Sequence, residues 1–173
     1  QKNSINYKVE LENQMTKQII SGIFPETFKL TAGHYYYYPP QDIEKAGSSI
    51  SLKCAKNDWT ACQVVVWMNE DYAVSVGNSE WIAQTGFTNN LRFAAEMPFP
   101  CQMNIEGMMM DDDRFLKADI LLSDPILEVK AKHPTGIWVE MQVPADAQAG
   151  SYSGKVLLYE KKGFEAEQKI KEF

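Results

Sequence analysis

The sequence lacks most of the features that catalytic and membrane-spanning chains carry. Its 173 residues include only two histidines, His34 and His133, which lie far apart and have no partner at the spacing of a zincin metal site. No G-x-S-x-G motif and no glycine-rich phosphate loop is present, so neither a catalytic triad nor a cofactor is expected. Apolar runs such as residues 64–68 are far shorter than the roughly 20 residues that cross a bilayer, so no membrane span is expected.

An excess of positive charge is also missing. Lysine and arginine number 17 against 23 acidic residues, for a formal net charge of −6. A general nucleic-acid-binding protein needs a basic stripe, so nucleic acid is not an expected partner. Hydrophobic residues make up 45% of the chain, which is enough to bury a core. One folded domain over residues 1–173 is therefore predicted.

Cysteine is scarce and its spacing is uninformative. Cys54, Cys62 and Cys101 contain no C-x-x-C pair, which argues against a zinc site and a disulfide framework. We expect three buried, reduced thiols, because each lies in an apolar stretch; one disulfide with one free thiol is the alternative. The chain begins at Gln1 rather than methionine, which suggests a piece of a longer gene or a product without its leader. Localisation stays open, with an extracellular or cell-surface site favoured over a cytoplasmic one.

Alternation of apolar and polar residues dominates what is present. In short segments every second residue is apolar, and these segments end at Gly, Pro, Asn or Asp. This pattern is typical of an all-β chain. We predict an antiparallel β-sandwich of about ten strands, immunoglobulin- or jelly-roll-like. The segment 61–68 is nearly all apolar and is predicted to be a central strand buried on both faces. The predicted strands are 7–11, 28–38, 50–54, 61–68, 91–97, 101–110, 118–122, 137–143, 152–159 and 164–173.

Two clusters are candidate binding sites. Four consecutive tyrosines, Tyr35, Tyr36, Tyr37 and Tyr38, would alternate between the faces of a strand, and an outward pair could stack on a sugar ring or a protein partner. Packing in the core or at its rim is the alternative for these residues. The acidic run Asp111, Asp112 and Asp113 offers oxygen ligands for calcium but lacks the spacing of an EF-hand loop. We expect a solvated loop and no metal there, with these residues as the candidates if a cation binds.

The stretch 118–159 contains the most specific motif of the chain. It includes Val143-Pro144-Ala145-Asp146 followed by Gly150, Tyr152 and Gly154, a V-P-x-D-x-x-x-G-x-Y-x-G pattern. This pattern resembles the β-sandwich that precedes the catalytic barrel in glycoside hydrolase family 123. A second segment, from Ala55 to Val66, is similar to the family's A-x-x-E-x-x-x-x-Q-x-V motif and departs from it at Asp58, where the family has Glu. The resemblance covers residues 48–68 and 118–159, whereas residues 14–46 match nothing we can place.

The resemblance implies an N-terminal accessory domain with no catalytic residue of its own. In such proteins a (β/α)8 barrel follows the sandwich and carries the catalytic groups. Family 123 enzymes act on N-acetylhexosaminides with the acetamido group of the substrate as nucleophile. The expected partner of this chain is therefore its own downstream catalytic domain. Two alternatives stay open: a stand-alone carbohydrate-binding module that uses the tyrosines, and an adhesive sandwich that binds protein.

Overall fold

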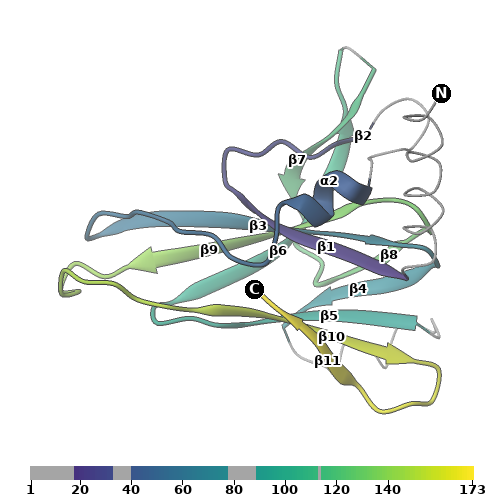
Figure 1. Ribbon diagram of the computed structural model, residues 1–173. Helices are drawn as coiled ribbons and strands as arrows, with labels where there is room; N and C mark the ends of the chain where they lie inside the picture. Colours follow the sequence, from purple (N-terminus) through teal and green to yellow (C-terminus); the bar gives the residue numbers. More distant parts are fainter. Residues whose placement is uncertain (1–17, 33–39, 78–88, 113) are drawn as a thin grey trace, which may run out of the picture.

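The computed structural model describes residues 18–32, 40–77, 89–112 and 114–173, which form two β-sheets packed face to face (Figure 1). The described strands number six in one sheet and five in the other. The prediction of an all-β sandwich is thus confirmed. Within these residues no helix is long and apolar enough to cross a membrane.

Every neighbouring pair in the six-stranded sheet is antiparallel. Two of its strands, β3 and β9, run side by side over nine paired positions and lie in the interior of the sheet. The strands in spatial order are β1 (Ile19–Pro25), β3 (Asp58–Met68), β9 (Thr135–Val143), β6 (Cys101–Met110), β7 (Leu116–Leu121) and β2 (Thr31–Ala32).

The five-stranded sheet contains one parallel pair, β4 with β5, in a sandwich whose other strand pairs are antiparallel, as predicted. The remaining pairs are antiparallel. The connection between β4 and β5 crosses residues 78–88, which lie outside the described part of the chain. The strands in spatial order are β11 (Gln168–Glu172), β10 (Lys155–Lys162), β5 (Asn89–Glu96), β4 (Tyr72–Val76) and β8 (Ile126–Val129).

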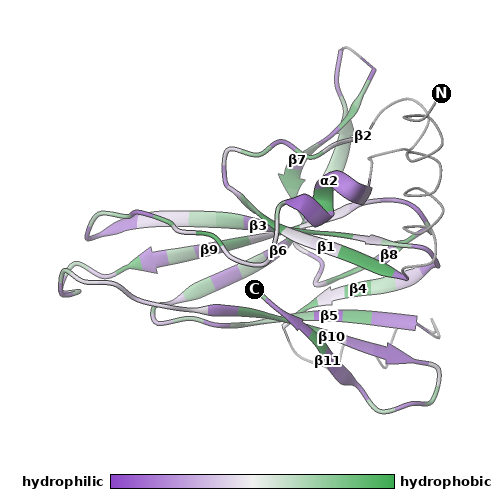
Figure 2. Ribbon diagram, in the orientation of Figure 1, coloured by the Kyte–Doolittle hydropathy of each residue, from purple (hydrophilic) through white to green (hydrophobic). Residues whose placement is uncertain are grey.

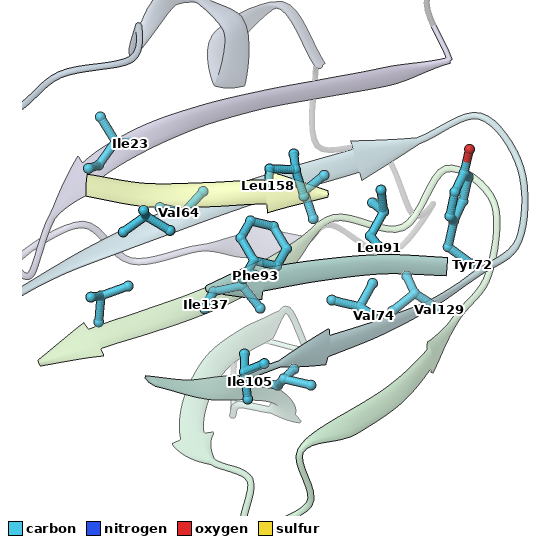
Figure 3. Packing of buried hydrophobic residues seen from close by; sticks show 14 of the residues in the cluster. Ile23, Val64, Tyr72, Val74, Leu91, Phe93, Ile105, Val129, Ile137 and Leu158 are labelled. Carbon is cyan, nitrogen blue, oxygen red and sulfur yellow. The ribbon is translucent and has the colours of Figure 1, made fainter. Parts of the chain in front are cut away.

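Side chains from both sheets meet in the main hydrophobic core (Figure 3). Val64 and Ile137 from the six-stranded sheet face Phe93 and Leu158 from the five-stranded sheet, and all four are fully buried. Tyr72 enters the same core, and its hydroxyl donates a hydrogen bond of 2.6 Å to Glu160 at the edge. Alternation along the strands therefore places one face of each sheet in the core.

A second hydrophobic cluster covers the outer face of the six-stranded sheet. Val65 and Trp67 of β3 point away from the main core and pack with Ile43 of the short helix α2 (Pro40–Lys45). Gly22 of β1 permits this close approach, because a Cβ there would lie 2.1 Å from the Ile43 carbonyl oxygen. The prediction that β3 is buried on both faces is confirmed.

Seven predicted strands correspond to β3, β5, β6, β7, β9, β10 and β11, with the last two joined at the expected hairpin. Three described strands, β1, β4 and β8, were not predicted. Of the predicted segment 28–38, the structure describes only β2 and the residues before it, and segment 7–11 lies outside the described residues. Segment 50–54 is not a strand: it lies outside every sheet, although burial alternates from Ile50 to Lys53 as in a strand.

Candidate functional site

A groove of about 860 Å³ opens at one end of the sandwich. One wall is the segment before β3, residues 49–56, and the other is the loop from β9 to β10, residues 147–154. These two segments turn at the left end of Figure 1. Core residues form the floor, since Cys62, Val139 and Val156 line the groove and are each at least 95% buried. The groove thus reaches the hydrophobic interior between the sheets.

The V-P-x-D-x-x-x-G-x-Y-x-G motif builds the second wall of this groove. The Tyr152 hydroxyl donates a hydrogen bond of 2.8 Å to the Gln148 carbonyl oxygen, which holds the loop together. The Tyr152 ring packs against Phe99 with 4.7 Å between the centroids and 58° between the planes. Gly154 lies against Met97, because a Cβ at this position would come within 2.3 Å of the methionine sulfur. The motif therefore fixes the shape of a surface rather than a catalytic centre.

The second motif has a structural role through Gln63. This buried side chain lies on β3, and its Nε2 donates to the carbonyl oxygens of Phe28 at 2.7 Å and Glu26 at 3.2 Å. The amide thus anchors the segment that follows β1. Asp58, which replaces the glutamate of the family motif, caps its own strand: Oδ1 accepts a 2.8 Å hydrogen bond from the Trp59 backbone N–H.

The three cysteines are all free thiols, but only one of them is buried. Cys62 lies in the core, and burial raises the pKa of its thiol to about 11, with Cys101 adding to the shift. Cys54 and Cys101 are exposed, so the expectation of three buried thiols is wrong for these two. Cys54 lies in the unpaired segment before β3 and Cys101 at the first residue of β6, where apolar neighbours in sequence do not ensure burial.

Glu106 is a buried carboxyl that sequence reasoning missed. It lies on β6 facing away from Ile105 and the main core, and its side chain fits against Gly136, where a Cβ would lie 2.0 Å from Oε2. Only 6% of the residue is exposed, and Oε2 has no hydrogen-bond partner within the described part of the chain. Burial raises the pKa of Glu106 to about 7, opposed by the charge of Lys29. Lys29 itself pairs with Asp119 on β7.

Exposed apolar side chains gather on the hairpin of β6 and β7. This hairpin projects from the sandwich (Figure 1). In Figure 2 the arrowhead of β7 is green, the colour of hydrophobic residues. We call its five large exposed side chains the hairpin patch: Met109, Met110, Phe115, Ile120 and Leu121. Ile120 also covers Gly107, where a Cβ would lie 2.6 Å from the isoleucine side chain. Met109 and Met110 are consecutive residues of β6, and Ile120 and Leu121 are consecutive in β7, so both faces of the hairpin present apolar side chains.

The predicted site residues do not come together. Tyr35, Tyr36, Tyr37, Tyr38 and Asp113 lie outside the described residues, so their roles stay predictions. Asp111 forms an ion pair of 2.6 Å with Lys117, which contributes to lowering the pKa of this carboxyl. Asp112 is exposed at the turn, and no metal-binding group of three side chains occurs among the residues that the structure describes.

The family is decided by a match over residues 31–160, three quarters of the chain, to the model of the glycoside hydrolase 123 N-terminal domain. The chain belongs to this family. The match includes residues 31–46, which the motifs alone did not place. No curated protein matches the chain.

Two solved structures give further comparisons. The chain is similar to part of a family 123 glycoside hydrolase from Clostridium perfringens, solved to explain glycolipid glycan hydrolysis, with a TM-score of 0.54 and 11% identity. The similarity covers 89% of this chain and 26% of that enzyme, so the chain spans about a quarter of its length. At this identity the likeness shows the fold. The sporulation control protein Spo0M from Bacillus subtilis is more distant, with a TM-score of 0.32 and 9% identity over 89% of this chain and 49% of that one.

Proposed function

We propose that the chain is a non-catalytic accessory domain that supports the catalytic (β/α)8 barrel of a family 123 glycoside hydrolase. The family match over residues 31–160 carries this proposal. An N-terminal domain of this family implies a catalytic portion elsewhere in the same polypeptide. The parent enzyme would hydrolyse glycans that contain N-acetylhexosamine, and this sandwich would contribute no group to that reaction.

The hairpin patch supplies the contact surface for such a role. Met110 is 66% exposed, and Met109 and Leu121 are about half exposed, so large apolar side chains face solvent in the isolated domain. Burying them against a neighbouring domain would remove apolar surface from water, worth roughly 25 cal/mol per Å². Interfaces between domains of one chain commonly combine apolar side chains with polar ones.

Hydrolysis of an aryl N-acetylhexosaminide tests the proposal. The 173-residue chain is assayed beside the native gene product from its source, at equal molar concentration. We expect release of the aryl group by the native product and none above background by the chain. Hydrolysis of the substrate by the purified 173-residue chain would overturn the accessory role.

A pair of variants in the native product tests the hairpin patch. Met109→Lys with Met110→Lys places two charges in the patch, and Phe164→Lys is the control, since Phe164 is fully exposed in the turn between β10 and β11. The patch variant is expected to lower the thermal midpoint of the native product and to leave that of the 173-residue chain unchanged. Equal effects on both proteins would contradict the proposed contact.

A further inference from the structure

Residues 49–53 have the alternating burial of a β-strand, but no strand lies beside them among the described residues. Ile50 and Leu52 are half-buried and pack against the main core, whereas Ser49, Ser51 and Lys53 are exposed. This alternation is that of a strand with one buried face. Yet within the described residues the backbone N–H and C=O groups of 49–54 make no hydrogen bond to other backbone or side-chain groups. The segment is a strand in pattern that lacks its pairing partner.

The opposite wall of the groove has the same property. Residues 151–154 are exposed, and their backbone groups form no hydrogen bonds to other groups of the described chain. Beyond them β10 begins, where Val156 exchanges backbone hydrogen bonds with Phe173 of 3.0 and 2.9 Å. Two unpaired backbone segments therefore face a groove whose floor is the apolar core.

From this geometry we infer that the groove binds an extended polypeptide segment by strand addition. Unpaired backbone donors and acceptors on the walls would give the main-chain hydrogen bonds, and apolar side chains of the incoming strand would enter between Leu52 and Met97. Six residues of wall, at about 3.3 Å each, span roughly 20 Å, the length of an ordinary strand. Lys53 and Lys56 are the charged residues among the described lining, so a neutral or mildly acidic segment fits best.

The occupant is a segment of the same polypeptide outside these 173 residues, an inference that rests on the proposed function. The chain corresponds to only 26% of the family 123 enzyme from Clostridium perfringens, so most of such a polypeptide is available as a source. Phe173 itself lines the groove, so polypeptide that follows Phe173 in a longer protein starts at this surface. A segment supplied by the same chain binds at high effective concentration, which favours even a short strand.

Hydrogen–deuterium exchange on the native gene product and on the 173-residue chain tests this inference. In the chain, amides of residues 50–54 and 151–154 are expected to exchange rapidly, because their N–H groups bond only to water. In the native product the same amides are expected to exchange at least tenfold more slowly. Amides of β3 and β9 serve as the internal reference, since both proteins contain these paired strands.

A matched pair of variants shows whether the groove itself is responsible. Ser51→Pro removes a backbone N–H from the wall of the groove, and Ser48→Pro makes the same change at an exposed position outside the lining. The Ser51 variant of the native product is expected to lose the protection, and the Ser48 variant to keep it. Urea denaturation of both variants of the chain checks that neither substitution unfolds the sandwich.

The outcomes separate the possible occupants. A native product longer than the chain whose amides at 50–54 and 151–154 are unprotected overturns this inference alone. A native product no longer than the chain overturns the proposed function and this inference with it. Protection that grows with the concentration of the chain points to a second copy, and protection that requires added N-acetylgalactosamine points to a glycan; either result also overturns the inference.

Discussion

Replacing Glu106 with glutamine is expected to remove a pH dependence from the stability of the chain. The carboxyl is buried on the outer face of the six-stranded sheet against Gly136, and Oε2 has no hydrogen-bond partner among the described residues. Burial raises the pKa of Glu106 from its ordinary 4.5 to about 7, while Lys29 lies near enough to oppose the shift. Glutamine has the shape of the protonated acid and carries no charge at any pH.

The sign of the effect follows from proton binding. The folded protein holds the Glu106 proton more tightly than the unfolded chain, so ionisation opposes folding. The contribution is absent below pH 4.5, grows as the pH rises and is complete above pH 7. One pH unit of pKa change corresponds to about 1.4 kcal/mol, so the loss at pH 8 is roughly 3 kcal/mol.

Urea denaturation at pH 4.5, 6 and 8 measures this loss. The quantity compared is the free energy of unfolding of Glu106→Gln minus that of the unchanged chain, because the other titrating groups cancel in this difference. Relative to pH 4.5, the difference is expected to increase by roughly 3 kcal/mol in favour of the variant at pH 8. Glu165→Gln, at an exposed turn, is the control and should show no such change. A difference for Glu106→Gln that stays constant between pH 4.5 and 8 would refute the reasoning.

Three further predictions address other parts of the chain. Gln63→Met removes the amide that donates hydrogen bonds to the Phe28 and Glu26 carbonyl oxygens. The free energy of unfolding, measured in urea, is expected to fall by about 1–3 kcal/mol, and a fall below about 0.5 kcal/mol would contradict the anchoring role. A thiol reagent such as Ellman's reagent should label the exposed Cys54 and Cys101 in the folded chain and the buried Cys62 only on unfolding; labelling of all three at the rate of unfolding would contradict the exposure of the first two. Arg92→Met breaks a mostly buried ion pair with Glu167 and removes the guanidinium that lies 4.3 Å from the centroid of the Tyr159 ring. The free energy of unfolding should fall by about 1–3 kcal/mol, and equal urea midpoints for the variant and the unchanged chain would contradict this prediction.

The sequence predicts strands well where one pattern dominates. The apolar run 61–68 leads directly to β3, because burial on both faces leaves a continuous apolar sequence. The alternation in 137–143 leads to β9. β1 was missed because Ser21 and Gly22 interrupt its apolar pattern, and Gly22 is there for the approach of α2. Such a need is visible only when the packing partner is known.

Segment 50–54 shows where local pattern stops being sufficient. Its alternation correctly predicts that Ile50 and Leu52 face the core, but it fails at Cys54, which is exposed. Pairing depends on a neighbouring strand, and the described residues contain none beside this segment. Glu106 shows the same limit for the site. A glutamate between Ile105 and Gly107 would ordinarily be assigned to the solvent face of a strand, whereas the side chain is buried and packs against Gly136 of β9, a neighbour that is distant in the sequence.

The mass of the native gene product tests the central claim most directly. The 173-residue chain has a mass of 19.7 kDa, and the family 123 enzyme to which it is similar is more than three times as long, since the match covers 89% of this chain and 26% of that enzyme. An accessory domain predicts an intact native product that contains this sequence and is larger by several hundred residues, enough for a (β/α)8 barrel of about 250 residues. A native product of about 19.7 kDa would contradict the account, because no barrel could then belong to the same polypeptide.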